Sequence, residues 1–178
     1  MASASHKKVI VRRTRGEILH GYLGLSGFVR NRALGLLDLS GRVAPLMLND
    51  IKMVSYVRDF NLSDTVNPER LTRRTFLARP RTEGLWLRLT FTSGELLEGL
   101  APTDLSLLDD LVNDAGLFLI PPDIRSNTQR IFVPRTSISE LTLLAVVTSP
   151  SKKKPTVAPQ SPQQDLFEAD LPPNARPN

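Results

Sequence analysis

The sequence of 178 residues contains no cysteine and only two histidines. Without cysteine there is no disulfide framework, no thiol nucleophile and no cysteine-bound zinc or iron–sulfur site. His6 and His20 are too few for a histidine-rich metal site. His20 occupies an alternating position of an expected strand, and an imidazole there needs a positioned partner before it can act as a base. No set of nucleophile, base and orienting group accompanies it, so the sequence predicts a protein that is not an enzyme and takes no cofactor.

Long apolar runs are also lacking. No stretch is long enough to cross a bilayer as a helix, and the first eight residues lack the apolar core of a secretory signal. From these two absences we expect a cytoplasmic protein without membrane insertion.

Charge is unevenly distributed along the chain. Residues 1–58 carry ten Lys and Arg against three acidic residues, a net charge of +7. Residues 85–149 carry four Arg against eight acidic residues, a net charge of −4, while the whole chain has +5. Such a split predicts one of two arrangements. Either the basic half binds nucleic acid, or the two halves attract each other within one chain or a dimer.

Two blocks of the chain repeat one another. Residues 9–22 align with residues 87–100 at a shift of 78 positions, so that Gly16-Glu17 falls on Gly94-Glu95. Farther along, at a shift of 87 positions, the aligned pairs are Leu46 with Val133, Ile51 with Ile138 and Val54 with Leu141. The nine additional positions enter the second copy in the interval that contains residues 121–130. Because of this internal repeat, we interpret the chain as two copies of one structural unit.

Within each copy apolar and polar residues alternate, as in residues 85–91, which is typical of a half-buried strand. Glycine in the turns at 15–17 and 93–95 permits tight hairpins. The other expected strands are 33–38, 43–48 and 53–57 in the first copy and 116–120, 130–135 and 138–147 in the second, with a short helical turn at 48–51. Five short strands with such a break before the last predict a small SH3-like or Sm-like barrel. The expected fold class is therefore mainly β, with two tandem barrels that closure leaves without open edges.

This pattern divides the chain into four parts. The first barrel covers residues 1–58, a connecting segment 59–84, the second barrel 85–149 and a tail 150–178. Pro68 would suit the first turn of a short helix at 67–76. The tail is rich in Pro, Lys, Gln and Ser, and such a composition predicts disorder because it buries too little apolar area.

The polar stretch 121–130 interrupts two apolar strands of the second copy. One interpretation is a long connecting loop, stopped by Pro121-Pro122. The other is a recognition loop in which two arginines flanking an asparagine grip a phosphate or a carboxylate. We expect an ordered loop that projects from the barrel, held by side-chain to backbone bonds of two residues and presenting two guanidinium groups outward. The residues are Asp123 and Asn127 for the bonds, and Arg125 and Arg130 for the guanidinium groups.

This stretch also carries a resemblance. The pattern from Phe91 to Gly99, the pattern from Gly116 through Ser126-Asn127 to Val133, and the ending Val57-Arg58-Asp59-Phe60 of the first copy resemble an uncharacterised family of bacterial domains. The similarity spans about residues 7–147. In that family copies occur in pairs or beside signalling modules. The resemblance implies a repeated small β-barrel and no particular reaction.

A second resemblance concerns a nucleotide. Arg70 and Arg74, followed by Asp104 and Ser106, are similar to the paired motifs of PilZ domains, which bind cyclic di-GMP. Arginines can grip the phosphates and stack on guanine. Asp109 stands where the PilZ pattern has glycine, and its carboxylate would repel an anionic ligand.

A third resemblance concerns nucleic acid. Gly21 followed by Asn31 is similar to the RNA-binding loop of Sm proteins, although the acidic residue expected at Gly27 and the later Arg-Gly pair are missing. A basic patch is the candidate surface, and a solvated basic face is the alternative. Its residues are Arg12, Arg13, Arg15, Arg30, Asn31 and Arg32.

The tail holds one further motif. Its residues are Gln163, Asp165, Leu166 and Phe167, and they resemble the short peptide with which bacterial proteins dock on the replication sliding clamp. The alternative is an inert tail with a chance apolar pair. Taken together, the sequence predicts a binding or regulatory module whose partner is a protein, a nucleic acid or, less in keeping with its charges, a cyclic dinucleotide.

Overall fold

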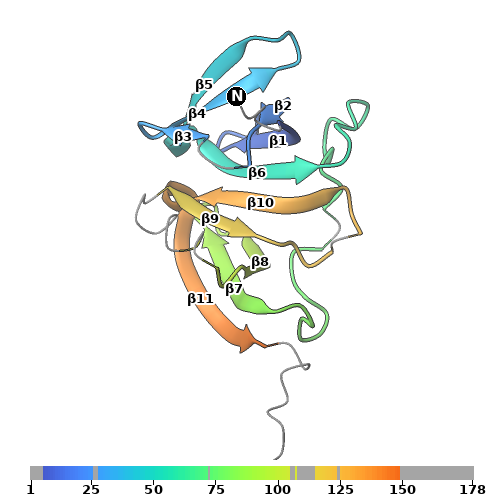
Figure 1. Cartoon of the computed structure of the whole chain (residues 1–178), viewed down its shortest axis with the longest axis vertical. Helices are drawn as coiled ribbons and strands as arrows, with labels where there is room; N and C mark the ends of the chain where they lie inside the picture. Colours follow the sequence, from blue (N-terminus) through green and yellow to red (C-terminus); the bar gives the residue numbers. More distant parts are fainter. Residues whose placement is uncertain are drawn as a thin grey trace, which may run out of the picture.

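The computed structural model describes residues 6–25, 28–71, 73–104, 107, 115–123 and 125–148, and these residues form a mainly β protein (Figure 1). Its first half, residues 6–58, and its second half, residues 84–148, are joined by the connecting segment 59–83. The elements are β1 (Lys7–Arg13), β2 (Ile18–Leu23), β3 (Val29–Arg30), β4 (Ala33–Asp38), β5 (Val43–Met47), η1 (Leu48–Asp50), β6 (Ile51–Val57), β7 (Gly84–Phe91), β8 (Leu96–Ala101), β9 (Gly116–Leu119), β10 (Thr128–Pro134), η2 (Arg135–Ser137) and β11 (Ile138–Val147).

The strands form one sheet of eight and one sheet of three. The larger sheet has the order β3-β4-β2-β1-β6-β10-β9, with β5 paired to β4, and the smaller has the order β11-β7-β8. The prediction of two closed barrels is wrong, because neither sheet closes. One edge of β6 pairs with β10 of the second half. In a closed barrel, that edge would pair with a strand of the first half. The pairing with β10 satisfies the backbone groups of β6 and runs one sheet through both halves.

The same pairing pattern recurs in the two halves. β1 pairs with β2 and β6, and β7 pairs with β8 and β11. β4 pairs with β5 as β9 pairs with β10. β2 pairs with β4, and β8 meets the end of β9 through a bridge between Leu100 and Ile120. The two halves therefore share part of one pairing scheme, although among the described strands the pairings of β3 with β4 and of β6 with β10 have no counterpart.

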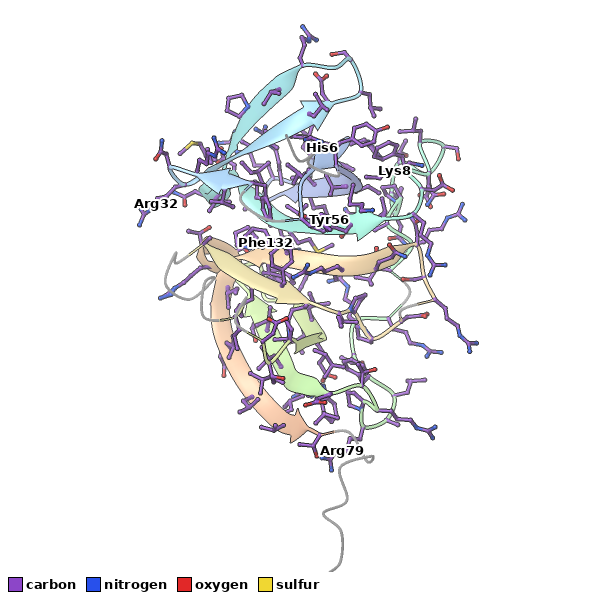
Figure 2. The ribbon with its side chains drawn as sticks, in the orientation of Figure 1. His6, Lys8, Arg32, Tyr56, Arg79 and Phe132 are labelled. Carbon is purple, nitrogen blue, oxygen red and sulfur yellow. The ribbon has the colours of Figure 1, made fainter. Side chains whose placement is uncertain are left out.

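Two apolar clusters lie where the halves meet. One is built mainly from the first half and is completed by Ala115, Phe118 and Phe132 of the second. The other is built mainly from the second half and takes Met53 from the first. Figure 2 shows Tyr56 and Phe132 on the facing strands of this junction. Burial of these side chains ties the halves together as one unit.

The predicted strand positions after residue 30 agree closely with the structure. A single 3-10 turn precedes the last strand in each half, at 48–50 and at 135–137. Gly16 and Gly94 have φ of 90° and 82°, as the expected hairpin turns require. Among the described residues there is no helix that could cross a membrane. The tail, including the motif at 163–167, lies outside the described residues.

The short helix expected at 67–76 does not form in the described part of that segment. Side-chain bonds hold its backbone instead. The buried carboxylate of Glu69 accepts bonds from Arg12 Nε and Nη2, at 2.7 and 2.8 Å, and the backbone oxygen of Glu69 accepts from Thr128 Oγ1 at 3.0 Å. These contacts attach the segment to both halves.

Candidate functional site

A surface hollow of about 470 Å³ lies where Asp123 and residues 125–127 meet the end of β6 and the connecting segment. Two regions that are far apart in sequence therefore share one site. The lining residues are Arg58, Asp59, Asn61, Arg70, Asp123, Arg125, Ser126 and Asn127.

Asn127 fastens the polar loop to the end of β6. Its Oδ1 accepts the N–H of Asp59 at 2.8 Å, and its Nδ2 donates to the backbone oxygens of Asp59 and Pro68, at 2.7 and 3.0 Å. Asn61 Nδ2 donates to the same Pro68 oxygen at 2.8 Å. The N–H of Arg58 donates to the backbone oxygen of Asn127 at 3.0 Å. Two asparagines thus hold the floor of the hollow by bonds to backbone, as their short amide side chains favour.

The loop is also held from within. Asp123 Oδ1 accepts the N–H of Arg125 at 3.1 Å, and Ser126 Oγ donates to the Asp123 oxygen at 2.7 Å. The sequence prediction that Asp123 and Asn127 hold the loop through backbone bonds agrees with this geometry. The expectation of a projecting loop does not, because Asn127 docks the loop on residues 59–68.

Three exposed arginines, Arg58, Arg70 and Arg125, surround the hollow. In the part of the chain that the structure describes, no ion pair engages any of their guanidinium groups. Asp59 is paired with Lys8 Nζ at 3.2 Å, so its charge is partly compensated from outside the hollow. The hollow therefore carries excess positive charge at a place whose backbone is fixed. Guanidinium groups in this setting suit a carboxylate or a phosphate.

Arg130 does not join this site. Its guanidinium carbon lies 3.7 Å from the centre of the Phe118 ring, so it makes a cation–π contact at the junction of the halves. Burial raises the pKa of the neighbouring Tyr56 phenol far above its usual value, against the opposing effect of Arg130. The outward orientation predicted for Arg130 is wrong, because its guanidinium group stacks on the face of the Phe118 ring.

A second, smaller hollow of about 70 Å³ contains Arg74. There Glu95 bonds to Lys52 Nζ at 2.7 Å and to the Arg74 guanidinium. Bonds from these two cations lower the pKa of Glu95 to about 2. The proposed nucleotide motif is therefore divided: Arg70 lines the first hollow and Arg74 the second, while Ser106 lies outside the described residues. Asp104 lines neither hollow and has an interaction of its own.

The predicted nucleic-acid patch is only partly available. Arg12 is bound to Glu69, and Arg13 Nη1 pairs with Glu17 at 2.8 Å. The other members are exposed at two different places, Arg15 in the turn between β1 and β2, and Arg30 to Arg32 at the end of β3 and in the turn that follows it.

Sequence reasoning had not placed Arg58, Asp59 and Asn61 in a site. The resemblance of the ending at 57–60 was a signal for Arg58 and Asp59, and Asn61 had none. The described residues contain no group of three or more His, Cys, Asp or Glu side chains that could hold a metal ion. The hollow thus offers binding groups but no metal centre within that part of the chain.

The model of a family of unknown function (DUF6982) matches residues 5–145, which cover the described elements from β1 to most of β11. Searches of curated proteins and of solved structures find no match.

Proposed function

We propose that this chain, which belongs to the family of unknown function DUF6982, is a non-enzymatic binding module that takes an anionic group in the hollow lined by Arg58, Arg70, Arg125 and their neighbours. The observation that carries the proposal is the set of three exposed guanidinium groups around a floor fixed by Asn127. Because their charges are not used by the described part of the chain, they are free to pair with a carboxylate or a phosphate of a ligand.

Two alternatives have less support. A cyclic di-GMP site would need Arg70 and Arg74 together, but Arg74 is engaged by Glu95 in the other hollow. A nucleic-acid surface would use the +7 charge of residues 1–58, but Arg12 and Arg13 are held in ion pairs. Binding without base contacts would rest on the remaining exposed arginines.

The test is isothermal titration calorimetry of the full chain with pyrophosphate and with citrate, which present phosphate and carboxylate charge. We expect binding of at least one probe, weakening as salt is raised. The Arg58→Ala/Arg125→Ala double variant should lose about tenfold or more in affinity. The charge-matched control, Arg15→Ala/Arg73→Ala, should bind as the wild type does.

Two outcomes would reject the proposal. One is the absence of binding for both probes at about 1 mM. The other is equal loss in the double variant and its control, which would mean that net charge rather than the hollow attracts the anion. The same titration with cyclic di-GMP and with a short RNA tests the alternatives.

A further inference from the structure

The joint between the halves is asymmetric. β6 of the first half lends its edge to β10 of the second, with Val54 opposite Phe132 and Tyr56 opposite Arg130. Phe118 and Phe132 then cover Val54 and Tyr56, which are 0% and 4% exposed. The last strand of the first half, β6, is thus paired with β10 and covered by side chains of β9 and β10.

In the second half β11 holds the position that β6 holds in the first. Tyr56 pairs with Val9 and Val54 with Val11 across β1, and in the same way Leu143 pairs with Leu87 and Leu141 with Leu89 across β7. In the described part of the chain, however, no strand pairs with the other edge of β11. Leu141 and Leu143 are 47% and 52% exposed, where their counterparts are almost fully buried.

In the first half β4 and β5 hold the positions of β9 and β10. The pair Gly35 and Pro45 stands where the second half has the pair Phe118 and Phe132. Two rings are thus replaced by two small residues. A hollow of about 370 Å³ lies there, lined by Phe28, Arg30, Ala33, Leu34, Gly35 and Pro45. Within the described residues the outer edge of β5 is also unpaired.

The two unpaired edges complement each other. One offers exposed leucines on a strand, and the other offers an apolar hollow beside a strand with the exposed side chains of Val43 and Met47. The half that contains the hollow is basic and the half that contains β11 is acidic. β5 lies at one end of the long axis of the molecule and β11 along the opposite part, so one chain presents the two edges to different neighbours (Figure 1).

We propose that copies of this chain associate head to tail, with β11 of one copy added to the β5 edge of the next. The internal joint sets the expected register, with Leu141 opposite Pro45 and Leu143 opposite Val43. Leu141 and Leu143 enter the hollow as Val54 and Tyr56 are covered inside the chain. Such a contact is heterologous and continues into a ring or a filament. Pro45 has no N–H to donate, so the edge forms fewer backbone bonds and the association is reversible.

The test is sedimentation velocity of the full chain from about 10 μM to about 1 mM. We expect the weight-average sedimentation coefficient to rise with concentration. Leu143→Asp, on the strand, and Val43→Asp, beside the hollow, should each weaken association about tenfold or more. Leu77→Asp is the matched control, because Leu77 is 79% exposed and lies in the connecting segment, outside both β5 and β11.

Mixing the two edge variants tests the head-to-tail geometry. Leu143→Asp keeps an intact β5 edge and Val43→Asp keeps an intact β11 edge, so an equimolar mixture should form a dimer and stop there. A two-fold contact of one patch with itself would give no such complementation. Hydrogen exchange of the wild type provides a readout without mutation, with protection of β5 and β11 rising with concentration. A monomer at all concentrations, or equal behaviour of Leu77→Asp and the edge variants, would overturn the proposal.

Discussion

Phe132 is the side chain whose removal should best reveal that the two halves are one cooperative unit. It is 1% exposed, and its ring centre lies 5.1 Å from each of the rings of Phe28 and Phe118. One of those rings belongs to the first half and one to the second. Phe132→Ala therefore removes contacts from both sides of the junction at once.

The expected cost is about 3–5 kcal/mol of unfolding free energy, the range for truncating a buried Phe to Ala. Part of it comes from the two ring pairs, each worth about 0.5–1.5 kcal/mol beyond the burial of area. With a urea dependence of about 2 kcal/mol/M, the midpoint should fall by about 1.5–2.5 M. The loss of unfolding free energy is thus a large share of the total of about 5–15 kcal/mol typical of a native protein.

The assay is urea unfolding followed by two probes. Fluorescence of Trp86, the only tryptophan, reports the second half, and far-UV circular dichroism reports all strands. We expect coincident transitions in the wild type and in Phe132→Ala, shifted together. Leu77→Ala, at an exposed position, should change stability by less than about 0.5 kcal/mol. A cost below about 1 kcal/mol, or separate transitions for the two probes, would refute the reasoning.

Two carboxylates provide further predictions. Glu98 is 2% exposed and accepts hydrogen bonds from three neighbouring groups, including Trp86 Nε1 at 3.2 Å. Glu98→Ala should therefore lower the unfolding free energy by about 2–4 kcal/mol and change the near-UV circular dichroism of Trp86. Retention of both wild-type values would contradict this. The pKa of Glu95 is lowered from 4.5 to about 2, so its stabilising effect is complete above pH 4.5 and is lost as the pH falls toward 2. Glu95→Gln should therefore flatten the dependence of the thermal midpoint on pH in that interval, and an unchanged slope would refute the assignment.

The strands were predictable because alternation is a local property. The boundaries of β4, β5 and β11, and the 3-10 turns before β6 and β11, follow from period and turn residues alone. Whether each sheet closes into a barrel was not predictable, because closure depends on which strand edges pair with each other. The choice of β10 rather than β5 as the partner of β6 is a contact between residues more than 70 positions apart.

The candidate site was predictable in part. Asp123 and Asn127 belong to residue types that bond to backbone in turns, and their pattern marked an ordered loop. The identity of the backbone they meet could not be deduced, since Asp59 and Pro68 lie in another part of the chain. The inward stacking of Arg130 on Phe118 was missed for the same reason, because the ring reaches it only after the sheet has formed.

The shared sheet has a consequence for synthesis on the ribosome. Val54 and Tyr56 emerge early, but Phe118 and Phe132, which cover them, are made later. At about 5–20 residues per second, Phe132 follows Tyr56 after about 4–15 s. During that interval the nascent first half has its apolar groups and the edge of β6 exposed to water, and an edge in this state is open to wrong partners. The amino-terminal half therefore waits for the carboxyl-terminal half, and a chain cut between them leaves a fragment that cannot complete its own core.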